Sequence, residues 1–174
     1  MSQILYYTLV KQDHWSFYIV CTNNALCFVG SSPASLEEMT DWVSFYFKEA
    51  ELIKDDQVLE PFRKEFISYL NKERQTFTFD TLFLNGTDFQ KKVWNSLKTI
   101  PYGERTTYGE LAVSIGYSDK AARAVGSALS ANPLLIVYPC HRVVPKSSAS
   151  KGFRGGLLMK EHLLALESTD DSLF

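Results

Sequence analysis

A cysteine and a histidine are adjacent in the segment Pro139-Cys140-His141-Arg142-Val143, and these two side chains together can perform nucleophilic chemistry. A thiol attacks as its thiolate, and a nearby imidazole or positive field lowers the pKa of cysteine from about 8.5. The apolar residues 134–137 favour a strand before the pair, so we expect Cys140 at a rigid strand end. Cys140 is therefore a candidate nucleophile. A buried structural cysteine with a histidine neighbour is the alternative interpretation.

Further motifs surround this segment. They are Tyr102-Gly103, Thr107-Tyr108-Gly109-Glu110-Leu111-Ala112, Ala121-Ala122-Arg123-Ala124-Val125-Gly126, Asn132-Pro133 and Gly155-Gly156-Leu157. Together with the cysteine segment, and in the same order, they resemble the O6-alkylguanine-DNA alkyltransferases, or methylated-DNA–protein-cysteine methyltransferases. The resemblance covers residues 86–167 and is weak before Gly86. We expect the stand-alone bacterial type, without an additional adaptor or phosphotriester-repair domain.

This resemblance implies direct-reversal DNA repair. The protein would flip O6-alkylguanine out of duplex DNA and transfer its alkyl group irreversibly to the Cys140 thiolate, with O4-alkylthymine as a further candidate substrate. His141 would deprotonate Cys140 directly or through a water, and Glu167 would orient the imidazole. Tyr108 would hydrogen-bond the flipped base, and Asn132 would hold the loop that carries the thiol. Because a thioether has no easy route back to a thiol, each molecule would act once, without a cofactor.

The resemblance also implies a DNA interface on a slim helix. Most residues between Ala121 and Ala128 are small, and Arg123 is the main long side chain among them. Small residues suit close approach to a DNA groove, and they suit tight packing against a core equally well. The resemblance implies that this helix enters the minor groove and that Arg123 fills the gap left by the flipped nucleotide. The expected DNA-binding residues are Thr107, Lys120, Ala122, Arg123, Gly126 and Ser127.

A pocket for the flipped base is expected beside Cys140. Tyr108 and Leu135 would line it, and Gly152-Phe153-Arg154-Gly155-Gly156 would form a loop whose backbone groups read the guanine edge. Relatives often have tyrosine where this chain has Phe153, and they vary at Arg154, which leaves the range of accepted alkyl groups open. The expected partner is double-stranded DNA containing O6-alkylguanine, bound by a monomer that does not contact membranes.

Composition and charge agree with a globular DNA-binding protein. The chain has 174 residues, of which 45% are hydrophobic and 22% charged. No signal peptide or membrane span is evident, so we expect a cytoplasmic protein. Three cysteines without a Cys-x-x-Cys pair argue against a disulfide framework or a four-thiolate zinc site. Residues 1–81 carry a net charge of −5 and residues 82–174 one of +3. Seven Lys or Arg residues and no Asp or Glu lie within residues 120–160, which predicts a basic face around Cys140.

Sequence patterns divide the chain into an N-terminal domain, residues 1–81, and a C-terminal domain, residues 82–174. Residues 4–9, 17–22 and 25–30 read as short strands of an antiparallel sheet, which the resemblance implies is ribonuclease-H-like. Ser35 starts a helix that runs to about Phe47, and Pro61 suits the first turn of another. The expected fold class is therefore α+β, with the sheet in the first domain.

The second domain is predicted to be mostly helical, and to transfer the alkyl group. Thr87 and Thr107 each begin a capping box at the start of a helix. Ser118 is expected to cap a further helix that runs to about Ser130. A helix, a turn that contains Gly116 and a second helix form a helix-turn-helix, the motif expected to contact DNA.

Two other functions remain open at this level. A non-catalytic binder of alkylated DNA would flag lesions for another repair pathway, although such relatives lack the cysteine that is present here as Cys140. A hydrolase or acyltransferase that uses Cys140, His141 and Glu167 would not need DNA. That function leaves the slim Arg123 helix and the acid-free basic stretch without a purpose. Product yield separates the two chemistries, because an alkyltransferase forms at most one product per molecule.

Overall fold

The computed structural model describes residues 3–146 and 153–168, and the chain forms two compact units, Met1–Asn85 and Gly86–Phe174. The division lies a few residues after the expected boundary at residues 81–82. The extended segment before it belongs with the first unit, because the Leu26 N–H donates to the Asp80 carbonyl at 2.9 Å and Thr81 forms a bridge with Leu26.

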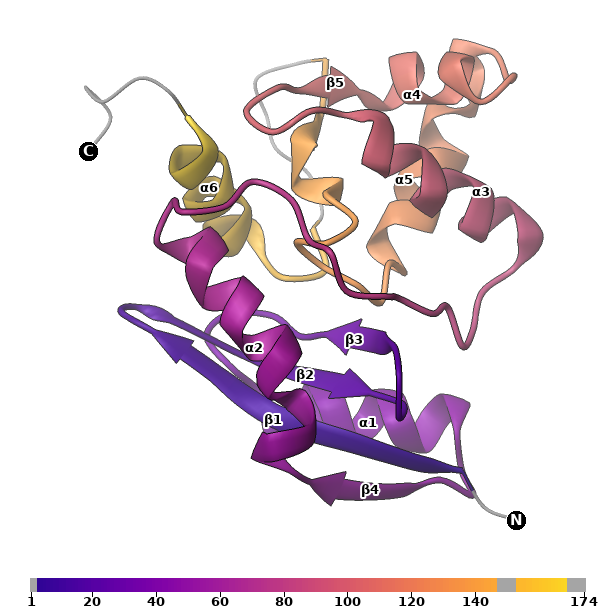
Figure 1. The fold of residues 1–174 in the computed structure, drawn as a ribbon. Coiled ribbons are helices and arrows are strands. Elements are labelled where there is room, and N and C mark those ends of the chain that lie inside the picture. Colours follow the sequence, from indigo (N-terminus) through magenta and orange to yellow (C-terminus); the bar gives the residue numbers. More distant parts are fainter. Residues whose placement is uncertain (1–2, 147–152, 169–174) are drawn as a thin grey trace. The chain divides into compact units, whose positions relative to one another are not determined.

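Four strands form the sheet of the first unit, in the order β3-β2-β1-β4 (Figure 1). Their bounds are β1 (Ile4–Gln12), β2 (Trp15–Cys21), β3 (Leu26–Val29) and β4 (Glu51–Lys54). β1 pairs antiparallel with β2, and β2 pairs antiparallel with β3, which confirms the predicted sheet and the α+β fold class. Sequence patterns do not predict β4, which pairs parallel with β1.

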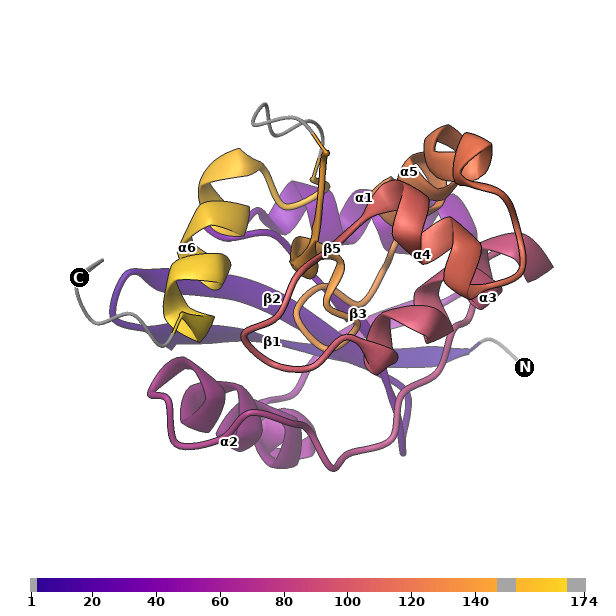
Figure 2. The ribbon, with the colours of Figure 1, turned by 90° about the horizontal axis from the view of Figure 1, so that it is seen from above.

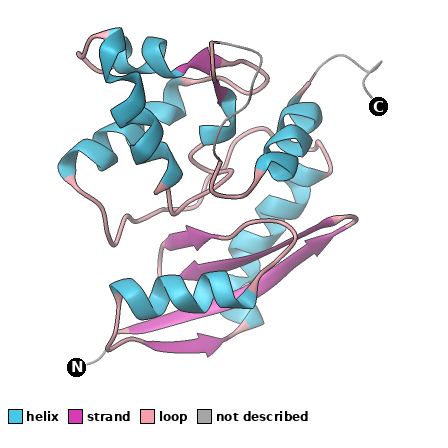
Figure 3. Cartoon of the chain, turned by 180° about the vertical axis from the view of Figure 1, so that it is seen from behind, coloured by secondary structure: helices cyan, strands magenta, loops and turns pink. Residues whose placement is uncertain are grey.

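Helices α1 (Leu36–Tyr46) and α2 (Asp56–Leu70) cover opposite faces of this sheet (Figure 2, Figure 3). The Ser35 hydroxyl caps α1 as predicted. The prediction that Pro61 lies in the first turn of α2 is wrong, because the Asp55 carboxylate already caps that helix by accepting two first-turn N–H groups. Pro61 lies inside the helix instead.

The second unit is mostly helical. Its helices are α3 (Asp88–Ser96), α4 (Tyr108–Ser114), α5 (Ala122–Ser130) and α6 (Leu157–Glu167). Thr87 and Thr107 form complete capping boxes, which confirms the predicted starts of α3 and α4. Ser118 does not cap α5, because a single 3₁₀ turn, η2 (Asp119–Ala121), lies between them. In the described part of the chain, no helix is long and apolar enough to cross a membrane.

A short parallel sheet joins two of the sequence motifs. β5 (Thr106–Thr107) pairs with β6 (Val143–Val144). Tyr108 begins α4 immediately after β5, and the 3₁₀ turn η3 (Cys140–Arg142) immediately precedes β6. This pairing brings the start of the helix-turn-helix beside the cysteine segment.

Residues 134–137 do not form the predicted strand. Backbone hydrogen bonds close them into a turn, in which Ile136 has the left-handed φ of 71°. The residues are nevertheless buried, because the Asn132 side chain supplies hydrogen bonds that a strand would obtain from its neighbours. Cys140 therefore lies in a buried turn and not at a strand end.

Candidate active site

The Cys140 thiol is held by one neighbouring side chain. Cys140 is 4% exposed at the start of η3. Asn132 Nδ2 donates to its Sγ at 3.3 Å and to the Tyr138 carbonyl at 3.0 Å, while Asn132 Oδ1 accepts the Leu134 N–H at 3.0 Å. Asn132 thus orients the sulfur and fixes the path of the loop that leads to it.

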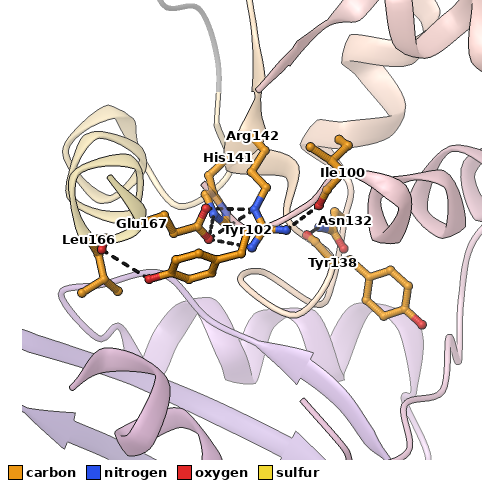
Figure 4. A network of polar contacts seen from close by, with 8 residues as sticks. All are labelled: Ile100, Tyr102, Asn132, Tyr138, His141, Arg142, Leu166 and Glu167. Carbon is orange, nitrogen blue, oxygen red and sulfur yellow. Dashed lines mark hydrogen bonds and ion pairs between the residues drawn. The ribbon is translucent and has the colours of Figure 1, made fainter. Parts of the chain in front are cut away.

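Glu167, in the last turn of α6, contacts both His141 and Arg142 (Figure 4). His141 Nε2 is 2.7 Å from Glu167 Oε1. Arg142 donates from Nε to Oε2 at 2.9 Å and from Nη2 to Oε1 at 2.8 Å. Its Nη1 donates to the Ile100 carbonyl at 2.6 Å. The structure thus brings two expected site residues together and adds Arg142, which sequence patterns had assigned to an exposed basic face.

Tyr102 supports this network from the turn that precedes β5. Its hydroxyl donates to the Leu166 carbonyl at 3.3 Å, and its ring centre lies 5.7 Å from the Arg142 guanidinium carbon (Figure 4). Gly103 has φ of 81°, and a Cβ there would lie 3.1 Å from the Glu167 carbonyl oxygen. The turn therefore packs closely on the end of α6 and closes the network from that side.

Electrostatics leave Glu167 ionised and His141 neutral. Burial raises the pKa of Glu167, but the hydrogen bonds from His141 and Arg142 and the Arg142 charge outweigh burial and hold that pKa well below its usual range. Burial lowers the pKa of His141 below 6.5 against the opposing effect of Glu167, and the charges of Arg142 and Lys160 lower it further. A neutral imidazole that donates from Nε2 to Glu167 has a lone pair on Nδ1. That Nδ1 is buried and has no hydrogen-bond partner among the described residues.

The thiol is protonated in this state. Burial raises the pKa of Cys140 above 9.0, and the hydrogen bond from Asn132 and the charges of Arg154 and Lys160 oppose the increase. The expectation that the surroundings lower this pKa is therefore wrong for the resting protein, because burial outweighs the hydrogen bond and the positive charges. Among the described residues His141 makes no hydrogen bond to Sγ, since Nε2 binds Glu167 and Nδ1 is unpaired. Cys140 requires a base to become a nucleophile, and the direct contact with His141 is not formed.

Lys160 and Tyr108 lie near each other and are both coupled electrostatically to the thiol. Lys160 is 1% exposed, its Nζ donates to the Val143 carbonyl at 2.8 Å, and it lies 6.0 Å from the ring centre of Tyr108. Burial lowers the pKa of Lys160, whereas the charge of Cys140 raises it. Burial raises the pKa of Tyr108, and the Cys140 thiolate, once formed, raises it further, so the Tyr108 hydroxyl remains a donor. Sequence reasoning identified Tyr108 but counted Lys160 only as a surface charge.

The predicted basic face is smaller than residues 120–160 suggest. Arg142 and Lys160 point inward, because they bind Glu167 and the Val143 carbonyl respectively. Lys151 lies outside the described residues. Three basic side chains of the stretch are exposed: Lys120, Arg123 and Lys146.

The residues expected to contact DNA gather along α5. A groove of about 460 Å³ is lined by Tyr108, Ala122, Arg123, Gly126, Ser127, Ser130 and Pro145. A neighbouring hollow of about 510 Å³ shares Tyr108, Ala122 and Pro145 with it and reaches Thr107 and Lys146. Lys120 is exposed on η2, just before α5. The slim face of α5 is therefore open along this groove, while Val125, Ala128 and Leu129 are buried on its other face.

The expected base-reading loop is described from Phe153 onward, and Gly152 lies outside the described residues. A Cβ at Gly155 would lie 2.4 Å from Met159 Sδ, 2.7 Å from the Phe153 ring and 3.1 Å from Leu135 Cδ1. The loop therefore packs tightly against Leu135, the other residue expected at the pocket. Among the described residues, no group of three or more His, Cys, Asp or Glu side chains could hold a metal ion.

Comparison with known proteins identifies relatives of this site and fold. The family described as "6-O-methylguanine DNA methyltransferase, DNA binding domain" matches residues 88–169. The inducible methylated-DNA–protein-cysteine methyltransferase of Bacillus subtilis is 43% identical over 97% of this chain and 93% of its own. The O6-methylguanine methyltransferase of Mycobacterium tuberculosis has a crystal structure with a TM-score of 0.79 and 31% identity, covering 98% of this chain and 99% of that one. The crystal structure of Mycobacterium tuberculosis OGT in complex with DNA has a TM-score of 0.80 at 30% identity, covering 94% of this chain and 93% of that one.

Proposed function

Because the chain belongs to the O6-methylguanine DNA methyltransferase family, we propose that Cys140 is the residue that accepts the alkyl group. The protein carries out direct-reversal DNA repair, in which it transfers the methyl group of methylated DNA to a cysteine of its own chain. The observation that supports Cys140 is its place in the second unit: a buried thiol beside a neutral histidine whose other nitrogen is fixed by a carboxylate.

In this proposal His141 is the general base for Cys140. Glu167 holds the imidazole so that Nδ1 carries the lone pair, and Arg142 holds Glu167. A water molecule between Nδ1 and Sγ would satisfy the unpaired Nδ1 and carry the thiol proton to it. Asn132 keeps the sulfur oriented toward the incoming alkyl carbon. The resulting imidazolium is stabilised by the Glu167 charge.

The transfer itself is a displacement at the alkyl carbon. A bond forms between that carbon and Sγ as the bond from the carbon to guanine O6 breaks, and the electron pair remains with the guanine. The guanine then gains a proton. In the net change, the alkyl group moves from guanine O6 to Cys140 Sγ, and the proton of the thiol moves to the guanine. The Tyr108 hydroxyl, which remains protonated, donates a hydrogen bond to the leaving base, and the Lys160 charge beside it opposes the build-up of negative charge.

We propose that duplex DNA containing O6-alkylguanine binds along α5. The groove beside Tyr108 offers a surface for the duplex, and the planar side chain of Arg123, which lines it, can stack in the space that a flipped nucleotide vacates. Thr107, Lys120, Ala122, Gly126 and Ser127 line or flank the same surface. One chain carries every residue of this site, which supports action as a monomer. Three free cysteines and a DNA substrate support a cytoplasmic location.

The decisive experiment is intact-protein mass spectrometry after incubation with excess duplex that contains one O6-methylguanine. We expect a gain of one methylene group per molecule, mapped to Cys140 by peptide analysis, and no gain with undamaged duplex. The Cys140→Ala variant should bind the damaged duplex and remain unmodified. Lesion binding without a mass change would indicate a non-catalytic binder, and repeated product formation would indicate a hydrolase. Either result would contradict the proposal.

A further inference from the structure

Arg154 connects the base-reading loop to the residue that holds the nucleophile. Its Nε donates to the Asn132 carbonyl at 2.8 Å, and its Nη2 lies 3.4 Å from the Pro133 carbonyl oxygen. The Asn132 side chain in turn donates to Cys140 Sγ at 3.3 Å. Asn132 therefore accepts a hydrogen bond from Arg154 with its backbone carbonyl and donates one to the thiol with its side chain.

The loop around Arg154 has little freedom to accommodate a different arrangement. Gly156 has φ of 90°, and its N–H donates to the Phe153 carbonyl at 2.8 Å, which closes a tight turn. At the preceding residue, Gly155, even a Cβ would overlap the side chains of Met159 and Phe153. Packing therefore fixes one side of the loop, and the guanidinium of Arg154 fixes the other.

We propose that Arg154 is a positioning residue for alkyl transfer, which latches the segment from Phe153 to Gly156 onto the Asn132 backbone and presents a permanent positive charge to the Cys140 sulfur. This proposal rests on the proposed role of Cys140 as alkyl acceptor. It adds a residue that neither the catalytic set nor the DNA-contacting set includes.

Permanence of the charge distinguishes Arg154 from Lys160. Both charges favour the Cys140 thiolate against the effect of burial. Lys160 is an amine whose own pKa is lowered, first by burial and further by Arg105, so part of its charge can be lost. A guanidinium does not lose its proton in proteins. The charge of Arg154 therefore continues to favour the Cys140 thiolate when other groups of the site gain or lose protons.

Three variants distinguish the effect of the hydrogen bond to the Asn132 carbonyl from the effect of the positive charge. Arg154→Gln retains an N–H donor for the Asn132 carbonyl and removes the charge. Arg154→Lys retains the charge and removes the planar fork, and Arg154→Ala removes both. Arg63→Gln, an arginine of α2 in the other unit paired with Glu60, is the matched control. Melting temperatures of all four variants establish that each is folded before its reactivity is interpreted.

The readout is the rate at which iodoacetamide modifies Cys140, followed across pH by peptide mapping. It reports the thiolate and requires no alkylated DNA. At neutral pH we expect Arg154→Gln and Arg154→Ala to react about tenfold more slowly, with the pH midpoint moved to more alkaline values, and Arg154→Lys within about threefold of the parent. The rate of methyl transfer from O6-methylguanine duplex should be highest for Arg154→Lys, lower for Arg154→Gln and lowest for Arg154→Ala. The last variant loses both the charge and the hydrogen bond to the Asn132 carbonyl.

An Arg154→Gln profile that coincides with that of the parent would overturn the electrostatic role. A shifted profile that Arg154→Lys does not restore would overturn it as well, because the charge would then not be the cause. If the parent protein fails to accept a methyl group from DNA while the iodoacetamide profiles shift as expected, the role of Cys140 as acceptor fails and the effect of Arg154 on the thiol stands. The two proposals can therefore fail separately.

Discussion

Single residues of this site depend on charge compensation in a buried environment. Glu167 receives hydrogen bonds from Arg142 and His141 within a network that is almost fully buried. Removing one partner of a buried ion pair leaves the other charge desolvated, which typically costs about 3–5 kcal/mol. The carboxylate is therefore a structural requirement for Arg142 and an orienting group for His141 at the same time.

Glu167→Gln tests both roles. We expect the free energy of unfolding to fall by about 3–5 kcal/mol, because Arg142 stays buried without a counter-charge. Alkyl transfer should slow by about 10²-fold or more, since His141 is no longer held as a base. Urea unfolding and single-turnover rates provide the measurements. Glu161→Gln, an exposed position of the same helix, should change neither. Unfolding energies that agree within about 1 kcal/mol would show that Arg142 is not desolvated.

Sequence patterns named Cys140, His141, Glu167 and Asn132, which the structure brings together, but they assigned no inward role to Arg142 or Lys160. Cys140 and His141 are adjacent in a distinctive motif, whereas the partner of Arg142 is 25 residues away in α6. A signal for Lys160 was nevertheless present. Lys160, Leu163 and Glu167 are spaced three and four residues apart, so they share one face of a helix, and Leu163 marks that face as buried. Charges on an apolar face of a helix require partners inside the protein.

At the scale of elements, local signals predicted more than non-local ones. The capping boxes of Thr87 and Thr107 depend on residues three positions apart, and both appear as expected. β4 was missed because its pairing with β1 joins distant parts of the chain, and only its two central residues are half-buried. Residues 134–137 have the composition of a strand, but a strand and a buried turn look alike until the bonding of Asn132 is known.

The α5 helix provides a test of base flipping. Arg123→Ala should slow repair of O6-methylguanine in duplex by about 10-fold or more, because unstacking a nucleotide costs a few kcal/mol that Arg123 helps to offset. Reaction with the free base O6-methylguanine should be unchanged, since no flipping is needed. Lys120→Ala, which removes a neighbouring charge, should weaken binding to all duplexes alike. Equal losses on duplex and free base for Arg123→Ala would contradict a role in flipping.

Substitutions at Gly126 test whether the small residues of α5 are needed for DNA binding or for packing. A Cβ at Gly126 would lie 3.7 Å from the Tyr108 ring, an ordinary contact. Gly126→Ala should therefore raise the free energy of unfolding by about 0.5–1 kcal/mol, because glycine disfavours helix. Gly126→Leu should instead fill the groove beside Arg123 and weaken duplex binding while the protein stays folded. Thermal unfolding and fluorescence anisotropy measure the two effects. Unchanged duplex affinity in Gly126→Leu would show that this face does not meet DNA.

For the whole molecule, buried ionisable groups set the pH range of stability. His141 has its pKa lowered below 6.5, so the unfolded chain binds a proton there that the folded chain resists. Glu167 has its pKa held far below 4.5, so the unfolded chain again binds the proton first. On the alkaline side, burial raises the pKa of Cys21 to about 12 and raises that of Cys140 above 9.0, so the unfolded chain releases these protons first. Stability should therefore decline on both sides of neutrality.

Unfolding by urea, followed by circular dichroism from pH 3 to pH 10, tests this expectation. The free energy of unfolding should be greatest between about pH 6.5 and 9. It should fall as the pH drops below 6.5, because the folded protein resists protonation of His141. It should fall more steeply below pH 4.5, because the contribution of ionised Glu167 is then lost. His141→Gln cannot be protonated, so the decline between pH 6.5 and 4.5 should be shallower in this variant, while the steep decline below 4.5 remains. Parallel curves for the parent and His141→Gln would show that the imidazole is already protonated in the folded protein. In that case His141 could not take the proton of Cys140.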